Sequence, residues 1–102
     1  MDREILYSLI SKISGVSKGI SDSTRIYHDL FISGEDAYEF FEEVHRAFGT
    51  DLYSLDFSKY FPDESESFIW GLLMRLGVKY KKKEITIGHL LEVIRKKAWF
   101  DP

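Results

Sequence analysis

Cysteine is absent from the 102 residues of the chain. Its absence excludes disulfide bonds, cysteine-based zinc sites and a thiol nucleophile, and it is typical of proteins in a reducing compartment. Long hydrophobic runs are also missing, because Ser8, Ser11 and Lys12 interrupt the apolar positions of the N-terminal segment MDREILYSLISKISG. We therefore expect neither a signal peptide nor a membrane span in this segment, and we expect a cytoplasmic protein.

Residue patterns that accompany catalysis or metal binding are equally scarce. The three histidines, His28, His45 and His89, include no pair at the i, i+4 spacing of a helical metal site. The chain lacks the spacing of a glycine-rich phosphate loop and the Gly-x-Ser-x-Gly pattern of a serine nucleophile. The adjacent carboxylates Glu42 and Glu43 would diverge by about 100° on a helix, so they do not face a common substrate. We expect no enzyme, no metal and no cofactor.

The composition indicates a single hydrophobic core and an uneven distribution of charge along the chain. The hydrophobic fraction of 44% and the aromatic fraction of 16% suit a single domain over residues 1–102. Up to Ser67 the chain has 6 Lys and Arg against 14 Asp and Glu, a net charge of −8. From Phe68 onward it has 8 against 3, a net charge of +5, and the two sum to −3. We expect two surfaces of opposite charge.

Apolar residues recur at helical spacing in four segments, which predicts an all-α fold. One segment ends at Gly15, one runs from Ser33 to Gly49, one from Pro62 to Gly77, and one begins at Thr86. Residues 52–61 predict a short aromatic turn. The positions expected to face inward are, in chain order, Ile5, Leu6, Leu9, Ile10, Ile13, Ala37, Phe40, Phe41, Val44, Phe48, Ile69, Leu72, Leu73, Leu76, Ile87, Leu90, Leu91 and Ile94.

The segments between these helices also carry signals. Residues 15–31 combine glycines and serines with apolar residues, which predicts an ordered loop across the core. Residues 78–84 predict a loop, and Trp99 is expected to hold the last helix to the core. Ser33 is predicted to cap the second helix through its hydroxyl, with Asp36 three positions later as in a capping box.

The order of several residues resembles the acyl carrier proteins. Asp29-Leu30, Glu39, Phe48-Gly49 and Asp51-Leu52 fall without a gap in the register of a carrier's second helix and its surroundings. The segment EITIGHLLEVI, residues 84–94, is similar to a carrier's last helix. The resemblance implies a small acyl-carrier-like helical bundle with an extra helix inserted before the last one. The whole pattern looks most like a bacterial family of small carrier-like proteins without an assigned function.

The resemblance fails at the position that carries a carrier's chemistry. Carriers bind phosphopantetheine covalently through a serine at the start of the second helix, and Gly34 occupies that position here. Glycine has no hydroxyl to modify. Ser33 lies one residue earlier, which on a helix is a turn of about 100° and a shift of about 1.5 Å. A genuine carrier modified on Ser33 remains an alternative, and phosphopantetheine is expected only in that case.

The feature of a carrier that does remain is the acidic face of the second helix, where the resemblance implies that partner enzymes dock. Glu35, Glu39, Glu42 and Glu43 occupy that face by position. Four carboxylates beside a single arginine, Arg46, repel one another, and a basic partner would relieve that repulsion. The favoured function is a non-enzymatic adaptor or regulator that binds a protein with a basic patch. The simpler interpretation is a solvated helix face.

A run of lysines offers a third interpretation. Lys79, Lys81, Lys82 and Lys83 could bind nucleic acid or an acidic lipid surface. The chain as a whole is acidic, with a pI of about 5.6, and no sequence signature of base recognition accompanies the run, so a solvated loop is favoured over this function. The opposite charges of the two halves would also permit self-association of basic end to acidic helix.

Overall fold

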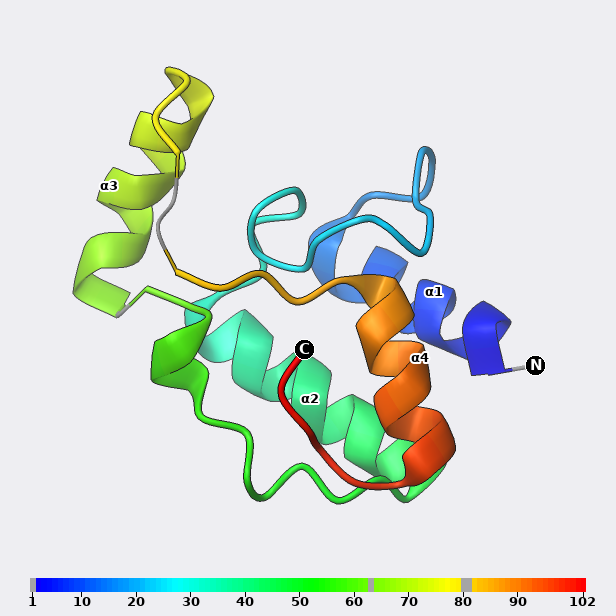
Figure 1. Cartoon of the computed structure of the whole chain (residues 1–102). Helices are drawn as coiled ribbons and strands as arrows, with labels where there is room; N and C mark the ends of the chain where they lie inside the picture. The colour runs from blue at the N-terminus through cyan, green and yellow to red at the C-terminus, as the bar shows by residue number, and fades with distance from the viewer. Residues whose placement is uncertain (1, 63, 80–81) are drawn as a thin grey trace.

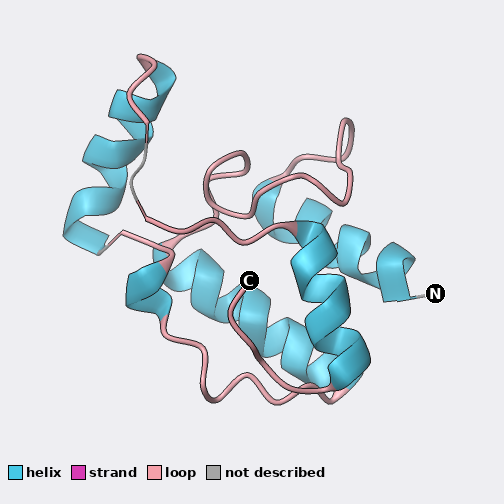
Figure 2. Cartoon of the chain, viewed as in Figure 1, coloured by secondary structure: helices cyan, strands magenta, loops and turns pink. Residues whose placement is uncertain are grey.

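A computed structural model of the chain describes residues 2–62, 64–79 and 82–102, with the backbone alone for 64–68. Its helices are α1 (Asp2–Ser14), α2 (Gly34–Phe48), α3 (Glu64–Arg75) and α4 (Ile87–Lys96), and a single turn of 3-10 helix, η1 (Phe57–Lys59), precedes α3 (Figure 1). No β-strand occurs among the described residues (Figure 2). The prediction of an all-α fold with an extra helix before the last one is confirmed.

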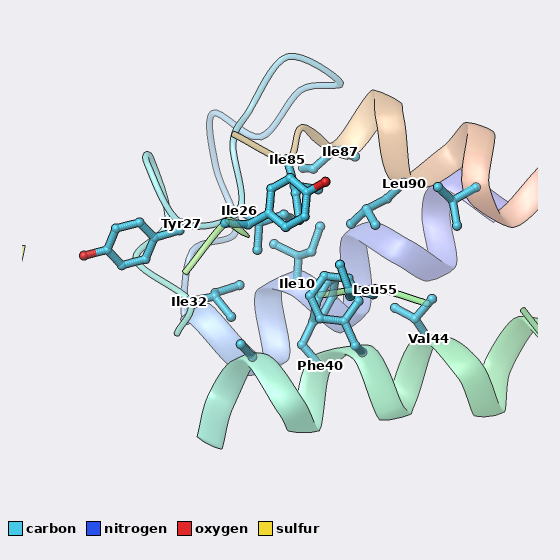
Figure 3. Close-up of a cluster of buried hydrophobic side chains, with 14 of the residues drawn as sticks. Ile10, Ile26, Tyr27, Ile32, Phe40, Val44, Leu55, Ile85, Ile87 and Leu90 are labelled. Atoms are coloured by element: carbon cyan, nitrogen blue, oxygen red, sulfur yellow. The ribbon is translucent and has the colours of Figure 1, made fainter. Parts of the chain in front are cut away.

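The core lies where α1 packs against both α2 and α4. Phe40 and Val44 of α2, Ile10 of α1 and Leu90 of α4 converge there and are fully buried (Figure 3). Each such side chain contributes roughly 1.5–3 kcal/mol through removal of apolar surface from water. The apolar stripe predicted for α2 is confirmed, with Phe48 at its edge only half-buried.

The long segment between α1 and α2 crosses the core, as predicted. Ile26 and Tyr27 are buried, and the Ile26 amide donates to the carbonyl of Ile85 at 2.8 Å. In return, the Ile87 amide donates to the carbonyl of Thr24 at 2.9 Å. This short antiparallel contact fixes the chain that enters α4 against the first loop.

The C-terminal residues are also fixed to the body of the protein. The Asp51 amide donates to the carbonyl of Lys97 at 2.9 Å, and the Trp99 amide donates to the carbonyl of Asp51 at 2.8 Å. The Trp99 ring is buried against Tyr60, with ring centroids 5.7 Å apart. The Tyr60 hydroxyl donates to Asp101. Trp99 therefore holds the end of the chain to the core, as the sequence predicted.

Two helix ends confirm predictions and two helix faces differ slightly. Gly49 adopts the left-handed conformation at the end of α2, with φ of 65°, which glycine accommodates at little cost. The Thr86 hydroxyl accepts a hydrogen bond from the His89 amide at 3.1 Å and caps α4. Val93 is fully buried in α4, whereas Leu91, which we expected inside, is half-buried. Ile5 of α1, also expected inside, is 42% exposed.

The predicted inward face of α3 is wrong. Ile69, Leu72 and Leu76 are 56%, 50% and 73% exposed, and Leu73 is half-buried. Helix α3 stands beside the bundle of α1, α2 and α4 (Figure 1), and it packs on the core through Trp70 and Met74 instead. These larger side chains lie on the neighbouring face of the helix, so their burial turns the leucine stripe outward.

Candidate functional site: the outer face of helix α2

The outer face of α2 carries an aromatic side chain among its acidic residues. Glu35, Tyr38, Glu39 and Glu42 stand at i, i+3, i+4 and i+7, so they share one face of the helix, and all four are exposed. Tyr38 is 58% exposed. Within the described part of the chain, no ion pair involves Glu35 or Glu39. Glu42 accepts a hydrogen bond from Arg46 at 2.7 Å.

Glu43, the fourth predicted acidic residue, lies on a different side of the helix. Its Oε1 is 3.7 Å from Nζ of Lys12 on α1 and 4.0 Å from a guanidinium nitrogen of Arg46. Its side chain is half-buried at the junction of α1 and α2. The structure therefore brings three of the four predicted residues onto one free face and assigns Glu43 to the contact between two helices.

An apolar groove of about 350 Å³ adjoins this acidic face. Tyr38, Phe41 and His45 of α2 form one wall, and Leu52, Tyr53, Leu55 and Phe57 form the other. The rings of Tyr38 and Phe57 are in contact, with centroids 4.4 Å apart and planes tilted by 42°. The carboxylates of Glu42 and Asp51 stand at the rim, and we name this surface, together with Glu35 and Glu39, the acidic groove.

Two hydrogen bonds hold residues 50–53, which lead into the second wall of the acidic groove. Nδ1 of His45 donates to the carbonyl of Thr50 at 2.8 Å, because a carbonyl oxygen can only accept. The Tyr53 amide donates to a carboxylate oxygen of Asp51 at 2.9 Å, as in an Asx turn. The turn leaves the Tyr53 side chain 97% exposed. The ring of Tyr53 is therefore available to a partner at the edge of the apolar groove, and tyrosine is among the residues enriched in binding hot spots.

The start of α2 corrects one prediction. Ser33 is at the N-cap position, but its hydroxyl makes no capping hydrogen bond. Gly34 follows with φ of 57°, a left-handed conformation that turns the chain between Ser33 and the first helical turn. The hydroxyl therefore does not align with the amides that a cap normally binds. A side chain at position 34 would be strained, so glycine suits this backbone better than serine does.

Comparison with known protein families assigns the chain to one family. The family model described as "Protein of unknown function (DUF1493)" matches residues 4–101. The chain belongs to this family. Among curated proteins and solved structures, none matches the DUF1493 chain significantly.

The lysine run of the DUF1493 chain lies away from the acidic groove. Lys79 and Lys83 are exposed, Lys82 donates through Nζ to the carbonyl of Phe61 at 3.0 Å, and Lys81 lies outside the described residues. With Arg25 and His28 they line a cleft of about 630 Å³. Arg25 in that cleft is already paired with Asp29 at 2.8 Å and with Glu84 at 3.2 Å. The charge of Arg25 is thus neutralised within the chain.

Two further features of the DUF1493 chain concern metals and membranes. The described residues contain no group of three or more histidine, aspartate or glutamate side chains placed to hold a metal ion. None of the described helices is both long and apolar enough to cross a membrane.

Tyr38 and Tyr53 are the residues of the acidic groove that the sequence analysis missed. The spacing of Tyr38 from Glu35, Glu39 and Glu42 could have placed it on the acidic face. Nothing in the local sequence indicated that Tyr53 would lie beside α2, because that contact depends on how residues 50–56 return along the helix.

Proposed function

We propose that this protein is a non-enzymatic adaptor that binds a protein partner through the acidic groove, without a covalent arm. The observation that carries the proposal is the shared face of Glu35, Tyr38, Glu39 and Glu42 beside an open apolar groove. Carboxylates would attract a basic partner, and the exposed rings of Tyr38 and Tyr53 would bind its apolar side chains. Such a surface combines electrostatic steering with a hydrophobic contact of the kind that dominates binding energy.

The likeness to acyl carriers supports the same surface. Acyl carriers, which the sequence resembles, dock on their partners through the acidic side of the second helix. In this chain Gly34 replaces the attachment residue, while the carboxylates of Glu35, Glu39 and Glu42 remain exposed on that side. These residues could therefore bind a partner protein as a carrier does, although the chain has no phosphopantetheine attached at position 34.

A carrier modified on Ser33 is the second candidate, and one observation favours it. The Ser33 hydroxyl is not engaged in a cap, so capping does not compete with modification. Against it stand the extended backbone of Ser33 and the left-handed Gly34, which separate that hydroxyl from the regular first turn of α2.

The adaptor proposal is tested by photo-cross-linking in cells of the organism that encodes the chain. p-Benzoylphenylalanine replaces Tyr38, and adducts are compared between this protein and a version that also carries Glu35→Lys and Glu39→Lys. Asp2→Lys with Glu4→Lys is the matched control, because it reverses two exposed carboxylates near the start of α1. We expect the α2 reversal to remove adducts formed with proteins that present a basic patch, and the α1 reversal to leave them. Equal adducts in all three proteins would contradict the proposal.

A further inference from the structure

The exposed apolar face of α3 is a second surface without a partner among the described residues. Ile69, Leu72 and Leu76 lie at i, i+3 and i+7 and form one stripe along the helix. The stripe faces away from the core because Trp70 and Met74, on the neighbouring face of α3, pack on the core. The guanidinium of Arg75 adds a second contact with the body of the protein, 5.7 Å from the ring centroid of Phe31. Three large aliphatic side chains thus form one exposed apolar patch, a feature that can mark a contact surface.

Positive charge borders the C-terminal end of this stripe. Arg75 is in the last turn of α3, and Lys79 follows Val78, which is also exposed. Lys83 is exposed beside them, on the same cleft as Lys79. Helix α3 therefore has the two properties that the acidic groove requires of a partner, an apolar stripe and basic residues at one end.

We propose that the partner of the acidic groove is a second copy of this chain, whose α3 binds in it head to tail. The proposal rests on the proposed function, because it names the occupant of the same surface. Leu72 and Leu76 of one copy would contact Tyr38, Tyr53 and Leu52 of the next. Lys79 and Lys83, which are exposed, would approach the rim carboxylates of Glu42 and Asp51.

The two surfaces lie on different parts of one molecule. Figure 1 shows α3 standing off one side of the bundle, while residues 50–56, which form the far wall of the acidic groove, run along another side. Trp70, Met74 and the contact of Arg75 with Phe31 hold α3 in that place. Binding between copies uses two different patches, so it is heterologous and leaves one free α3 and one free groove at the ends of each open assembly.

Charge supports a second copy as the occupant. The half of the chain up to Ser67, which supplies the groove, has a net charge of −8, and the half that supplies the stripe and its basic border has +5. Contact of the acidic half of one copy with the basic half of the next is attractive, and a head-to-tail arrangement provides that contact. The association is therefore expected to weaken as salt is raised from 50 to 500 mM.

Sedimentation velocity of the full chain tests the proposal, with variants that damage each surface separately. Leu72→Glu places a charge on the α3 stripe, and Tyr53→Lys places a basic residue in the groove. Val16→Glu is the matched control, because Val16 is also exposed but lies in the loop after α1. We expect concentration-dependent assembly of the unmodified protein and of Val16→Glu, and at least a tenfold weaker association for the other two. Circular dichroism shows whether each variant keeps its helices.

Mixing the two damaged variants gives the decisive result. Leu72→Glu keeps an intact groove and Tyr53→Lys keeps an intact α3, so an equimolar mixture has one good interface and is expected to form dimers and nothing larger. A monomeric unmodified protein at all concentrations would overturn the proposal. If Leu72→Glu lost assembly while Tyr53→Lys assembled normally, the proposal would be overturned in favour of α3 pairing with α3. If cross-links from position 38 to basic proteins persist in either case, the adaptor proposal survives and only the second copy as partner fails.

Discussion

Oε1 of Glu43 on α2 lies 3.7 Å from Nζ of Lys12 on α1. The contact joins two helices that share the core, and it explains why Glu43 is half-buried while Glu35, Glu39 and Glu42 are exposed. A partly exposed ion pair of this kind contributes about 0.2–1 kcal/mol to stability. We expect Glu43→Gln to lower the urea midpoint slightly and to leave capture of partners from position 38 unchanged. Loss of those cross-links in Glu43→Gln would show that Glu43 belongs to the binding face after all.

The N-caps of α2 and α4 predict different responses to the same kind of substitution. The Thr86 hydroxyl accepts from the His89 amide, whereas the Ser33 hydroxyl accepts no capping bond. We expect Thr86→Ala to reduce the free energy of unfolding by about 1 kcal/mol and Ser33→Ala to change it by less than about 0.5 kcal/mol. Urea denaturation followed by circular dichroism measures both. A comparable loss in Ser33→Ala would show that its hydroxyl does cap α2.

The left-handed backbone at Gly34 makes this position intolerant of a side chain. We expect Gly34→Ala to destabilise the protein by about 1–2 kcal/mol, the cost of a Cβ in this conformation. Gly71→Ala is the control, because Gly71 lies within α3 and a Cβ there would meet no heavy atom within 4 Å. Alanine is the better helix former, so this change should not lower the melting temperature. A melting temperature of Gly34→Ala equal to that of the unmodified protein would contradict the assigned conformation.

His28 predicts a dependence of stability on pH. Burial lowers the pKa of His28, and its contact with the Lys82 carbonyl at 3.2 Å opposes the shift only in part. The unfolded chain therefore takes up a proton at higher pH than the folded chain, near the ordinary value of about 6.5. Stability is complete above that value and falls as the pH decreases toward the lowered pKa of the folded state.

The measurement is urea denaturation at pH 7.5, 6.5 and 5.5 for the unmodified protein and for His28→Gln, which retains a donor for the Lys82 carbonyl. We expect the unmodified protein to lose more stability over this range than the variant. Parallel losses would show that His28 is not the group responsible.

Much of the fold could be predicted because local patterns and tertiary contacts agree. In α2 the spacing of Ala37, Phe40, Phe41 and Val44 already defines the buried face, and Gly49 defines the end. The same agreement holds for Thr86 and α4. The loop of residues 15–31 was recognisable because its apolar residues required burial somewhere.

The face of α3 could not be predicted for a physical reason. Leucines at helical spacing indicate an amphipathic helix, but they do not say which surface will cover them. Burial of Trp70 and Met74 determines the orientation of α3, and the leucines remain available for another molecule. The assignment of Glu43 to α1 and the position of Tyr53 beside α2 depend in the same way on packing between segments distant in sequence.

The central claim is that α2 acts through its outer face and carries no covalent arm. The most direct test is the intact mass of the protein after incubation with coenzyme A and a broad-specificity phosphopantetheinyl transferase, with a genuine acyl carrier protein in the same tube. We predict that only the carrier gains mass. Addition of one phosphopantetheine to this chain, abolished by Ser33→Ala, would contradict the account and make the protein a carrier with a displaced attachment site.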